Sequence, residues 1–514
     1  MVLFSSPARA KTLSSLYLGA GQSISIDTHL QLVMQGDGNL VLYQDGAALW
    51  ATSDLVSNDL QGFSGPTAGL SCSSCFAVFQ GDGNLVLYNP DFNGNIYHAY
   101  WASYTGGNPD STLQITSTSL VIVDSAGSPI WTASTCLHGG DQNTIQRVLV
   151  GVGAKARLCP YANFSLTGPI TFTASDQEIS TLGYPSDGSR AVLQVVGSQL
   201  DTAIIGKFSG IAIRNLIVDG NRPGLGRVVN GGALIDIGGD AANQFVDGIQ
   251  AFEPRGWSTL HIAPGVSSPY NCTGARITNN SIGPSGHSIP GQWADGISLR
   301  CANSIVSHNL ITDATDGGIV IFGSPGSTVT NNYIRTLSRV LNGGINLVDY
   351  GPFHGDFTNT SVSSNVIDAS GPGSYIRIGI ALGAPIWFGE NSNACLQDGG
   401  TADCDQLLLV GGLPGSNNAA YVVNNILTSN ASNRSAAMGY GIAARGITGF
   451  VITGNQSYAT YAGRIGSDPT TGLANPSPQP FVMSSIGTSI GTFQQFNVTP
   501  VGGLIGNGSP SIQP

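Results

Sequence analysis

The sequence predicts an all-β protein with two different halves. Its 514 residues include 71 glycines, and only 10% of them are charged. This composition favours strands joined by tight turns over long surface helices. Two nearly identical decapeptides lie near the N-terminus, and a looser repeat of the form apolar-x-x-Asn-x-apolar follows from about residue 136. Repeats of this length are typical of architectures that stack one supersecondary unit on the next.

The two decapeptides, residues 34–43 and 79–88, place polar side chains at every second position. Residues two apart in a strand share one face, so two amides, a carboxylate and a tyrosine ring line up in each copy. Such an array of donors and acceptors suits the hydroxyls of a hexose. The alternative is that Asp-Gly-Asn only forms a hairpin turn. The two sets are Gln35, Asp37, Asn39, Val41 and Tyr43, and Gln80, Asp82, Asn84, Val86 and Tyr88.

A third copy of this repeat has lost its polar pattern. Apolar residues and serines (Ile115, Ser117, Ser119 and Val123) occupy the positions of the glutamine, aspartate, asparagine and tyrosine. Each copy is followed by a tryptophan, which predicts a threefold β-prism. The pattern Gln-x-Asp-x-Asn-x-Val-x-Tyr resembles the bulb-type mannose-binding lectins over roughly residues 12–134. The resemblance implies mannose pockets at the first two copies and an inactive third one, within a domain of residues 1–134.

The second repeat predicts a solenoid over residues 135–514. Its asparagines are 23 to 33 residues apart, with one interval of 60 residues, and one coil of a parallel β-helix needs about that length. We expect them to stack as an internal ladder at a bend. A second strand of the form Gly-Ile-x-aliphatic follows in most coils. The pattern resembles the right-handed parallel β-helix of pectate lyases and polygalacturonases. We assign to the ladder Asn215, Asp247, Asn280, Asn309, Asn332, Asn365, Asn425 and Asn455.

Aligning the coils brings acidic side chains from neighbouring turns toward one outer groove. Two or three carboxylates of this kind suit glycoside hydrolysis, in which one acid protonates the leaving oxygen and another acts as base or nucleophile. Crowding would raise at least one pKa. The candidate catalytic residues are Asp295, Asp316, Asp313, Glu253 and His261. The candidate substrate-binding residues are Arg255, Trp257, Trp293, Arg300, Asn346 and Asp349. The insertion at about residues 385–420 is a candidate cleft wall.

Other interpretations of the second half remain open. Asp295, Asp313 and Asp316 could hold Ca²⁺ with Arg300 as base, as in a polysaccharide lyase. Otherwise the sequence predicts no metal and no cofactor. The aspartates could also be turn residues of a lectin or adhesin without catalytic activity. The sequence does not choose among these alternatives.

Charge and cysteine usage limit the partners and the compartment. A net charge of −11 argues against nucleic acid, and no apolar stretch is long enough to span a membrane. Nine Asn-x-Ser/Thr triplets and an even number of cysteines favour a secreted, extracellular glycoprotein, although residues 1–7 do not form a convincing signal peptide. The partner we expect is a polysaccharide or a mannose-type glycan. The cysteines pair by proximity as Cys72 with Cys75, Cys136 with Cys159, Cys272 with Cys301, and Cys395 with Cys404.

Overall fold

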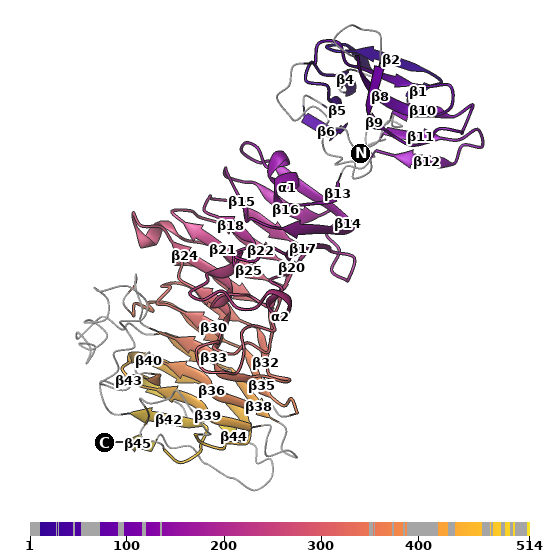
Figure 1. Ribbon diagram of the computed structural model, residues 1–514. Helices are drawn as coiled ribbons and strands as arrows, with labels where there is room; N and C mark the ends of the chain where they lie inside the picture. The colour runs from indigo at the N-terminus through magenta and orange to yellow at the C-terminus, as the bar shows by residue number, and fades with distance from the viewer. Residues whose placement is uncertain are drawn as a thin grey trace, which may run out of the picture. The chain divides into compact units, whose positions relative to one another are not determined.

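The computed structural model confirms the all-β fold, with a β-prism followed by a right-handed parallel β-helix (Figure 1). Contacts divide the chain into one unit of residues 1–140 with 157–159 and a second of residues 141–156 with 160–514. The structure describes residues 11–26, 28, 30–44, 47–52, 72–90, 97–115, 120–133, 136–348, 353, 355–372, 375–383, 386–387, 420–429, 437–464, 473, 476–484, 489–493, 497–498 and 511–513.

The first unit consists of three four-stranded antiparallel sheets. Their strand orders are β1-β10-β11-β12, β2-β7-β8-β9 and β3-β4-β5-β6, so each sequence repeat supplies most of one sheet. The strands are β1 (Lys11–Leu13), β2 (Leu16–Gly19), β3 (Ser23–Ser25), β4 (Leu30–Met34), β5 (Leu40–Gln44), β6 (Ala47–Ala51), β7 (Phe76–Phe79), β8 (Leu85–Pro90), β9 (Tyr97–Ala102), β10 (Thr112–Ile115), β11 (Leu120–Val123), β12 (Pro129–Thr132) and, at the end of the unit, β13 (Leu137–Gly140).

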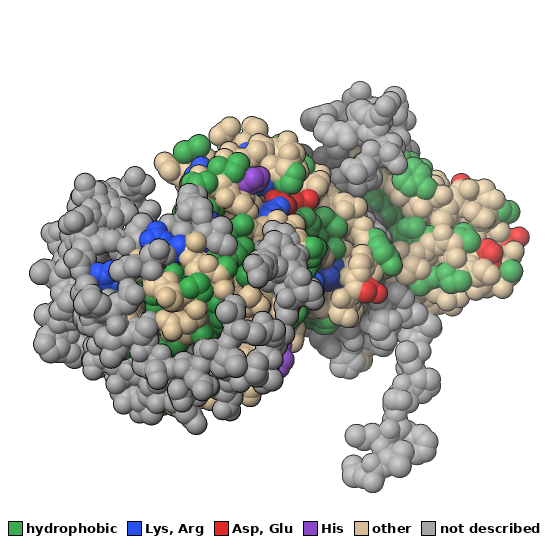
Figure 2. Space-filling model, turned by 90° about the horizontal axis from the view of Figure 1, so that it is seen from below, with side chains coloured by type: hydrophobic (Ala, Val, Ile, Leu, Met, Phe, Trp, Pro, Cys, Tyr) green, Lys and Arg blue, Asp and Glu red, His purple; other side chains and the backbone are tan. Residues whose placement is uncertain are grey.

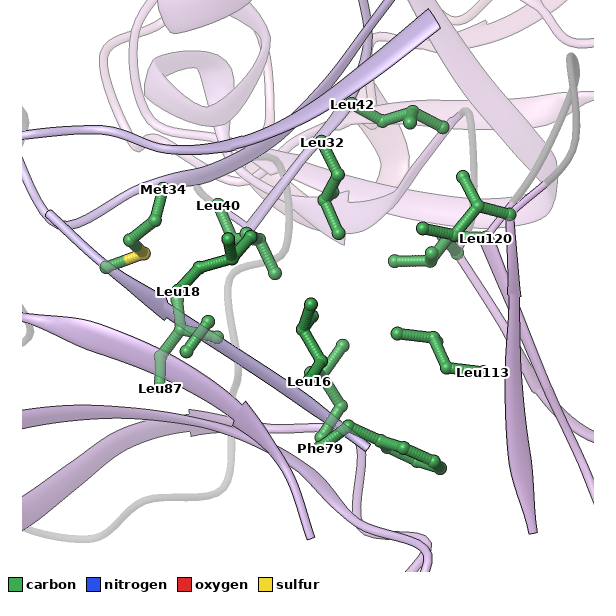
Figure 3. Close-up of a cluster of buried hydrophobic side chains, with 14 of the residues drawn as sticks. Leu16, Leu18, Leu32, Met34, Leu40, Leu42, Phe79, Leu87, Leu113 and Leu120 are labelled. Atoms are coloured by element: carbon green, nitrogen blue, oxygen red, sulfur yellow. The ribbon is translucent and has the colours of Figure 1, made fainter. Parts of the chain in front are cut away.

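Three tryptophans meet at the centre of this unit. Trp50, Trp101 and Trp131 each come from the last strand of a sheet, and their rings contact one another edge to face at 5.8–5.9 Å. Leucines from all three sheets pack against these tryptophans in one buried cluster. Figure 3 shows several of these leucines together with Met34 and Phe79. The third repeat therefore keeps the residues that pack the prism, although it has lost the polar pattern.

The second unit is a β-helix in which most coils give two strands to a long parallel sheet and one to an eleven-stranded parallel sheet. The long sheet contains β14 (Lys155–Leu166), β16 (Glu178–Thr181), β17 (Ala191–Val195), β19 (Ala212–Arg214), β20 (Leu216–Asp219), β22 (Phe245–Asp247), β23 (Gln250–Phe252), β25 (Arg276–Thr278), β26 (Ser281–Ile282), β28 (Ile305–Ser307), β29 (Leu310–Thr312), β31 (Thr328–Thr330), β32 (Tyr333–Arg335), β34 (Ser361–Ser363), β35 (Val366–Ala369), β37 (Tyr421–Val423), β38 (Ile426–Ser429), β40 (Thr448–Thr453), β41 (Gln456–Tyr458), β43 (Ser489–Phe493) and β44 (Asn497–Val498).

The eleven-stranded sheet carries most of the candidate site. Its strands are β15 (Ile170–Thr171), β18 (Ile204–Gly206), β21 (Ala233–Gly239), β24 (Ser258–Pro264), β27 (Asp295–Leu299), β30 (Gly317–Ile321), β33 (Val340–Leu347), β36 (Tyr375–Leu382), β39 (Ala437–Ala444), β42 (Phe481–Ser484) and β45 (Ser511–Gln513). The short helices are α1 (Gln142–Val148), α2 (Arg222–Leu225) and the 3₁₀ turn η2 (Pro269–Asn271). The Asp141 side chain caps α1, whose buried Ile145 faces the first coil.

A ladder of buried asparagines joins the coils at the bend of the long sheet. Each side-chain amide donates to the amide oxygen of the next coil at 2.9–3.0 Å, and that oxygen also accepts a backbone N–H. Every member has its polar atoms satisfied, which a buried amide requires. The ladder consists of Asn280, Asn309, Asn332, Asn365, Asn425 and Asn455.

Two predicted members lie outside this ladder. Asn215 has a left-handed φ of 50° and sits one position before the slot, which Leu216 fills. Asp247 sits two positions before Ile249, whose N–H donates to Asn280. The ladder therefore begins at Asn280, two coils later than the sequence pattern predicted.

A second column, of glycines, stacks inside the eleven-stranded sheet. Gly296, Gly318, Gly344, Gly379 and Gly441 follow one another from coil to coil. A Cβ on each of the first four would lie 2.4–2.8 Å from the carbonyl oxygen of the next glycine. This close approach explains the repeated Gly-Ile pairs of the sequence, because no larger residue fits there.

Gly344→Ala tests the column. The added methyl group would meet the Gly379 oxygen at 2.4 Å and Ile367 Cγ2 at 2.7 Å, so we expect the free energy of unfolding to fall by about 2–4 kcal/mol. Gly188→Ala is the matched control, because its Cβ would have open space. Denaturant unfolding of the two variants measures the difference, and equal midpoints would contradict the packing argument.

Candidate functional site

The eleven-stranded sheet brings Asp295 and Asp316 together. Asp295 begins β27, and Asp316 immediately precedes β30, the neighbouring strand. The Asp295 carboxylate accepts hydrogen bonds from the Ser298 hydroxyl and from the Gly317 N–H, both at 2.8 Å. Asp295 is only 5% exposed, whereas Asp316 is partly exposed. The two acids therefore form one pair, with Asp316 nearer to solvent.

A repeated kink in the strands turns Asp295 outward. Gly296 and Ile297 both face the interior: Ile297 is fully buried, and a Cβ on Gly296 would lie 3.0 Å from the core residue Ile311. Two consecutive inward positions leave Asp295 and Ser298 on the same outer face, where they hydrogen-bond. Local irregularities of this kind redirect side chains in sheets. The glycines of the column allow the kink in each coil from Gly296 onward, because a side chain at these positions would meet the next coil.

Burial and mutual repulsion shift the pKa values of the acid pair. Burial raises the pKa of Asp295 well above its usual value, and the charge on Asp316 raises it further. Burial also raises the pKa of Asp316, while a hydrogen bond from Asn342 opposes that rise. Burial and the closeness of two carboxyls of this kind both favour the protonated form of the pair.

Polar residues of the following coils support the pair. Asn342 Nδ2 donates to Asp316 at 3.3 Å, and Arg377 Nε from the next coil donates to Asn342 Oδ1 at 3.0 Å. Asn346 lies close by, since a Cβ on Gly317 would be 3.0 Å from its Nδ2 and 3.2 Å from Asp295 Oδ1. The Asn346 Oδ1 is buried and finds no donor among the described residues. A buried acceptor of this kind is suited to bind a substrate hydroxyl.

His261 lies one coil before the acid pair and forms a dyad with Asp236. Its Nδ1 is 3.2 Å from Asp236 Oδ1, and Lys207 Nζ is 2.8 Å from the other carboxylate oxygen. Burial lowers the pKa of His261, and Asp236 only partly opposes this. The imidazole is therefore neutral at neutral pH. Its buried Nε2 has no hydrogen-bond partner within the described ranges, so it can accept a proton.

No site role was assigned from the sequence to Asp236, Asn342 or Arg377. Asp236 was within reach, because extending the aligned column from His261 back by one coil gives this acid between two isoleucines. Asn342 and Arg377 lie in one column with Asp316. Each of the three stands one position before a residue that pairs with the neighbouring coil, and these paired residues are Gly317 in β30, Gly343 in β33 and Ile378 in β36.

Three aromatic or cationic candidates lie beside the site. Trp257 is 37% exposed, and its ring meets His261 edge to face at 4.8 Å. The Arg300 guanidinium lies 4.3 Å over the Phe322 ring, and its charge acts on both His261 and Asp295. Trp293 is partly buried next to Ala294, whose backbone contacts Thr315.

Other predicted site residues stabilise loops instead. The Arg255 guanidinium is 2% exposed and donates to five backbone carbonyls of residues 197–200 and 225–226, which removes it from the site. The Asp313 carboxylate accepts bonds from the backbone of residues 337–339 and from the Ser338 hydroxyl. Glu253 pairs with Arg339. Asp349 and the insertion residues Glu390, Cys395 and Cys404 lie outside the described residues.

The calcium alternative uses Asp313 as a third carboxylate beside Asp295 and Asp316. In the structure the Asp313 carboxylate accepts hydrogen bonds from Leu337 N–H and from the Ser338 hydroxyl. Within the part of the chain that the structure describes, no group of three His, Cys, Asp or Glu residues could hold a metal ion. Three of the predicted cysteine pairs are disulfides: Cys72–Cys75, Cys136–Cys159 and Cys272–Cys301.

The first unit presents two polar arrays of the same geometry. Gln35 Nε2 donates to the Tyr43 hydroxyl at 2.7 Å, and Gln80 Nε2 donates to the Tyr88 hydroxyl at 2.9 Å. Each aspartate accepts the N–H of the asparagine two residues later at 3.0 Å. The Asp-Gly-Asn segments thus do form turns, and the turns fix the exposed carboxylates of Asp37 and Asp82.

The asparagine and the valine also have matching environments in the two arrays. Asn39 Oδ1 accepts from Thr52 Oγ1, and Asn84 Oδ1 accepts from Ser103 Oγ. Val41 and Val86 are buried beneath their arrays at 2% and 3% exposure. In the third repeat, the buried Val123 takes the position of the tyrosine. Ile115 was expected at the position of the glutamine, but it pairs with Leu120 as Met34 pairs with Leu40 and therefore holds a core position. Ser117 and Ser119 lie outside the described residues.

Charged side chains are a small fraction of the sequence, at 10% of its residues. On the face in Figure 2, lysine, arginine, aspartate and glutamate side chains are few among uncharged polar and apolar ones. In the parts of the chain that are described, no helix is long and apolar enough to cross a membrane.

Comparisons with known proteins agree with this two-part fold. The family described as right handed beta helix region matches residues 264–382. The N-terminal part resembles the monomeric monocot mannose-binding lectins of Gastrodia elata, with 29% identity over 25% of this chain and 97% of theirs and a TM-score of 0.18. It also resembles the mannose-specific agglutinin of snowdrop (Galanthus nivalis), solved with methyl-α-D-mannoside, with 27% identity over 23% of this chain and 90% of that one and a TM-score of 0.16.

The β-helix part is similar to an enzyme module. The A-module of the mannuronan C-5 epimerase AlgE6 of Azotobacter vinelandii is 15% identical over 70% of this chain and 95% of that module, with a TM-score of 0.33. At this identity the likeness concerns the fold. No curated protein matches the chain.

The opposite pKa shifts of two aspartates give opposite dependences of stability on pH. Asp295 has a raised folded-state pKa, so its contribution is favourable at low pH and is lost as the pH rises through that pKa. Asp295→Asn should therefore make the β-helix more stable than the wild type at pH 7, because the amide cannot ionise. The gain should disappear toward pH 4.

Asp236→Asn is the matched variant with the opposite sign. Burial alone would raise the pKa of Asp236, but the bond to His261 and the charge of Lys207 hold it below its usual value. Its contribution is therefore present at neutral pH and lost on acidification, and the variant should be less stable than the wild type at pH 7. Urea unfolding between pH 4 and pH 7 measures both effects. The same sign for both variants would contradict the assigned environments.

Proposed function

We propose that the protein binds mannose-type glycans through its N-terminal unit and hydrolyses a polysaccharide on the outer face of its β-helix. The observation that carries the catalytic part is the buried carboxyl pair of Asp295 and Asp316. Glycoside hydrolysis needs one protonated acid and one ionised carboxylate on either side of the scissile bond.

The environments of the two acids assign their roles. Asp295 has the more strongly raised pKa and the deeper burial, so it keeps its proton and protonates the leaving oxygen. Asp316 is nearer to solvent, and the Asn342 amide stabilises its ionised form. It acts as the base that activates water or as the nucleophile. Asn346 Oδ1 accepts a hydroxyl of the bound sugar, and Trp257 contacts its apolar face.

A lyase is the second candidate, and the His261–Asp236 dyad favours it. A neutral imidazole with a buried, unpartnered Nε2 can abstract a proton, and Asp236 fixes the tautomer that leaves this nitrogen free. Arg300, whose charge reaches the same space, would stabilise the negative charge that develops on the substrate. In this mechanism the bond to the leaving oxygen breaks by elimination, without addition of water.

The mannose-binding part rests on the two matching arrays. Each holds an exposed carboxylate, two amides and a tyrosine hydroxyl in a fixed geometry before any ligand arrives. Attachment to a glycan surface would raise the local concentration of the catalytic unit there. An extracellular location fits the three disulfides, since such bonds persist in oxidising compartments.

Asp295→Asn and Asp316→Asn should each lower turnover at least about 100-fold, because each removes an acid–base group. The assay is a polysaccharide panel, read by new reducing ends and by the ultraviolet absorbance of an unsaturated product. Reducing ends without absorbance support hydrolysis, and both signals together support the lyase. Asp219→Asn, on the long sheet, is the matched control. Wild-type turnover in both site variants would overturn the assignment, as would the absence of any cleavage by the wild type.

Asp37→Ala combined with Asp82→Ala should abolish retention of the full chain on immobilised mannan, because both arrays lose their exposed carboxylate. Each single variant should still bind, with fewer sites per molecule in titration calorimetry. Asp124→Ala is the control, since the Asp124 carboxylate accepts the N–H groups of Ala126 and Ser128 in the turn between β11 and β12, outside both arrays. Mannan binding by the double variant would show that the arrays are not the sites.

A further inference from the structure

The second array lies beside a row of stacked aromatic rings that has no counterpart beside the first array within the described part of the chain. Tyr88, a member of the second array, stacks on Phe76 with ring centroids 5.4 Å apart, and Phe76 stacks on Tyr17 at 5.1 Å. The three rings come from adjacent strands, β8, β7 and β2, and cross the outer face of their sheet. Tyr17 is 62% exposed, and Phe76 and Tyr88 are partly exposed.

The first array offers an internal comparison. The residue that pairs with Tyr43 in the register of its sheet is Gln31, as Phe76 pairs with Tyr88. The counterpart of Tyr17 is Ser23, because Ser23 pairs with Val33 as Tyr17 pairs with Val78. The same face that is aromatic beside the second array is therefore polar beside the first.

Packing of the prism does not require this row. The side chains that fill the core alternate with it along each strand: Leu16, Leu18, Ala77 and Phe79 are buried, whereas Tyr17 and Phe76 point outward. An exposed aromatic surface that continues directly from a polar binding site is characteristic of ligand contact.

We infer that the row Tyr17–Phe76–Tyr88 is an extended subsite, which binds the second and third pyranose rings of a mannose-type oligosaccharide whose first residue occupies the second array. The polar array holds the hydroxyls of the first mannose. The aromatic row buries the apolar C–H faces of the next sugars. These faces need no hydrogen-bond partners and pack on aromatic rings. This inference rests on the proposed glycan binding of the N-terminal unit.

Two sites with the same motif should therefore differ in the length of the glycan that they prefer. The second site should prefer an oligosaccharide to a monosaccharide, because each added ring buries further apolar surface. The first site should bind a terminal mannose without regard to what precedes it. Tyr88 joins the two parts of the second site, since it accepts the hydrogen bond of Gln80 and stacks on Phe76.

Titration calorimetry on the full chain tests this inference, with methyl α-mannoside and a linear mannotriose as probes. Asp37→Ala leaves only the second site, and we expect it to bind the trisaccharide about tenfold more tightly than the monosaccharide. Adding Phe76→Ala or Tyr17→Ala should reduce that ratio to within about threefold while changing monosaccharide affinity less than about twofold. Tyr17→Ala changes an exposed side chain, which keeps the test independent of folding.

The control uses the first site. Asp82→Ala leaves only this site, which should bind both probes with similar affinity, and Gln31→Ala should change neither. Equal affinity for both probes at the second site, or a ratio unchanged by both aromatic substitutions, would overturn the subsite. So would a change of oligomeric state in these variants with no change in sugar affinity, since it would assign the row to contacts between protein chains. No binding of either probe by the wild type would refute the proposed glycan binding itself.

Discussion

The stacking of coils in one fixed register is the constraint on which the β-helix and its site depend. Two columns enforce it. In the asparagine ladder, each amide bonds to the amide and backbone of its neighbours, so a shift of one residue would bury several unsatisfied polar groups at once. In the glycine column, carbonyl oxygens approach the next chain so closely that only residues without a Cβ fit. The asparagine ladder holds neighbouring coils together by hydrogen bonds, and the glycine column excludes other registers by steric clash.

The site uses this register directly. Asp295 and Asp316 are 21 residues apart in the sequence and belong to different coils, yet one accepts a hydrogen bond from the residue that follows the other. Placing two carboxyls together in a partly buried position destabilises their ionised forms, and their pKa values are raised for that reason. The ladder and the apolar interior offset it, because each coil contributes fully buried isoleucines and leucines on the opposite side of the same strands.

The parts that repetition determines were predictable, and the parts that depend on single partners were not. The all-β fold and the pairing of neighbouring coils followed from the spacing of Asn280, Asn309 and Asn332. The prediction that Asn215 is the first member of the ladder was wrong. Asn215 fits the sequence pattern, but it adopts a left-handed conformation one position before the ladder position. Arg255 looked available, since no pattern reveals that five backbone carbonyls from two loops converge on it.

The same reasoning explains why equal motifs can differ in what they do. The prism requires one tryptophan and a set of inward leucines from every repeat, and all three repeats supply them. The outward positions are free of that requirement, so the third repeat has lost its polar array, and among the described residues a row of stacked aromatics flanks only the second repeat. Two sites that a motif search would call identical thus sit in different surroundings, one beside Gln31 and one beside Phe76. Specificity in such a repeat fold is determined by the outward residue of the neighbouring strand, because that residue can change without disturbing the core.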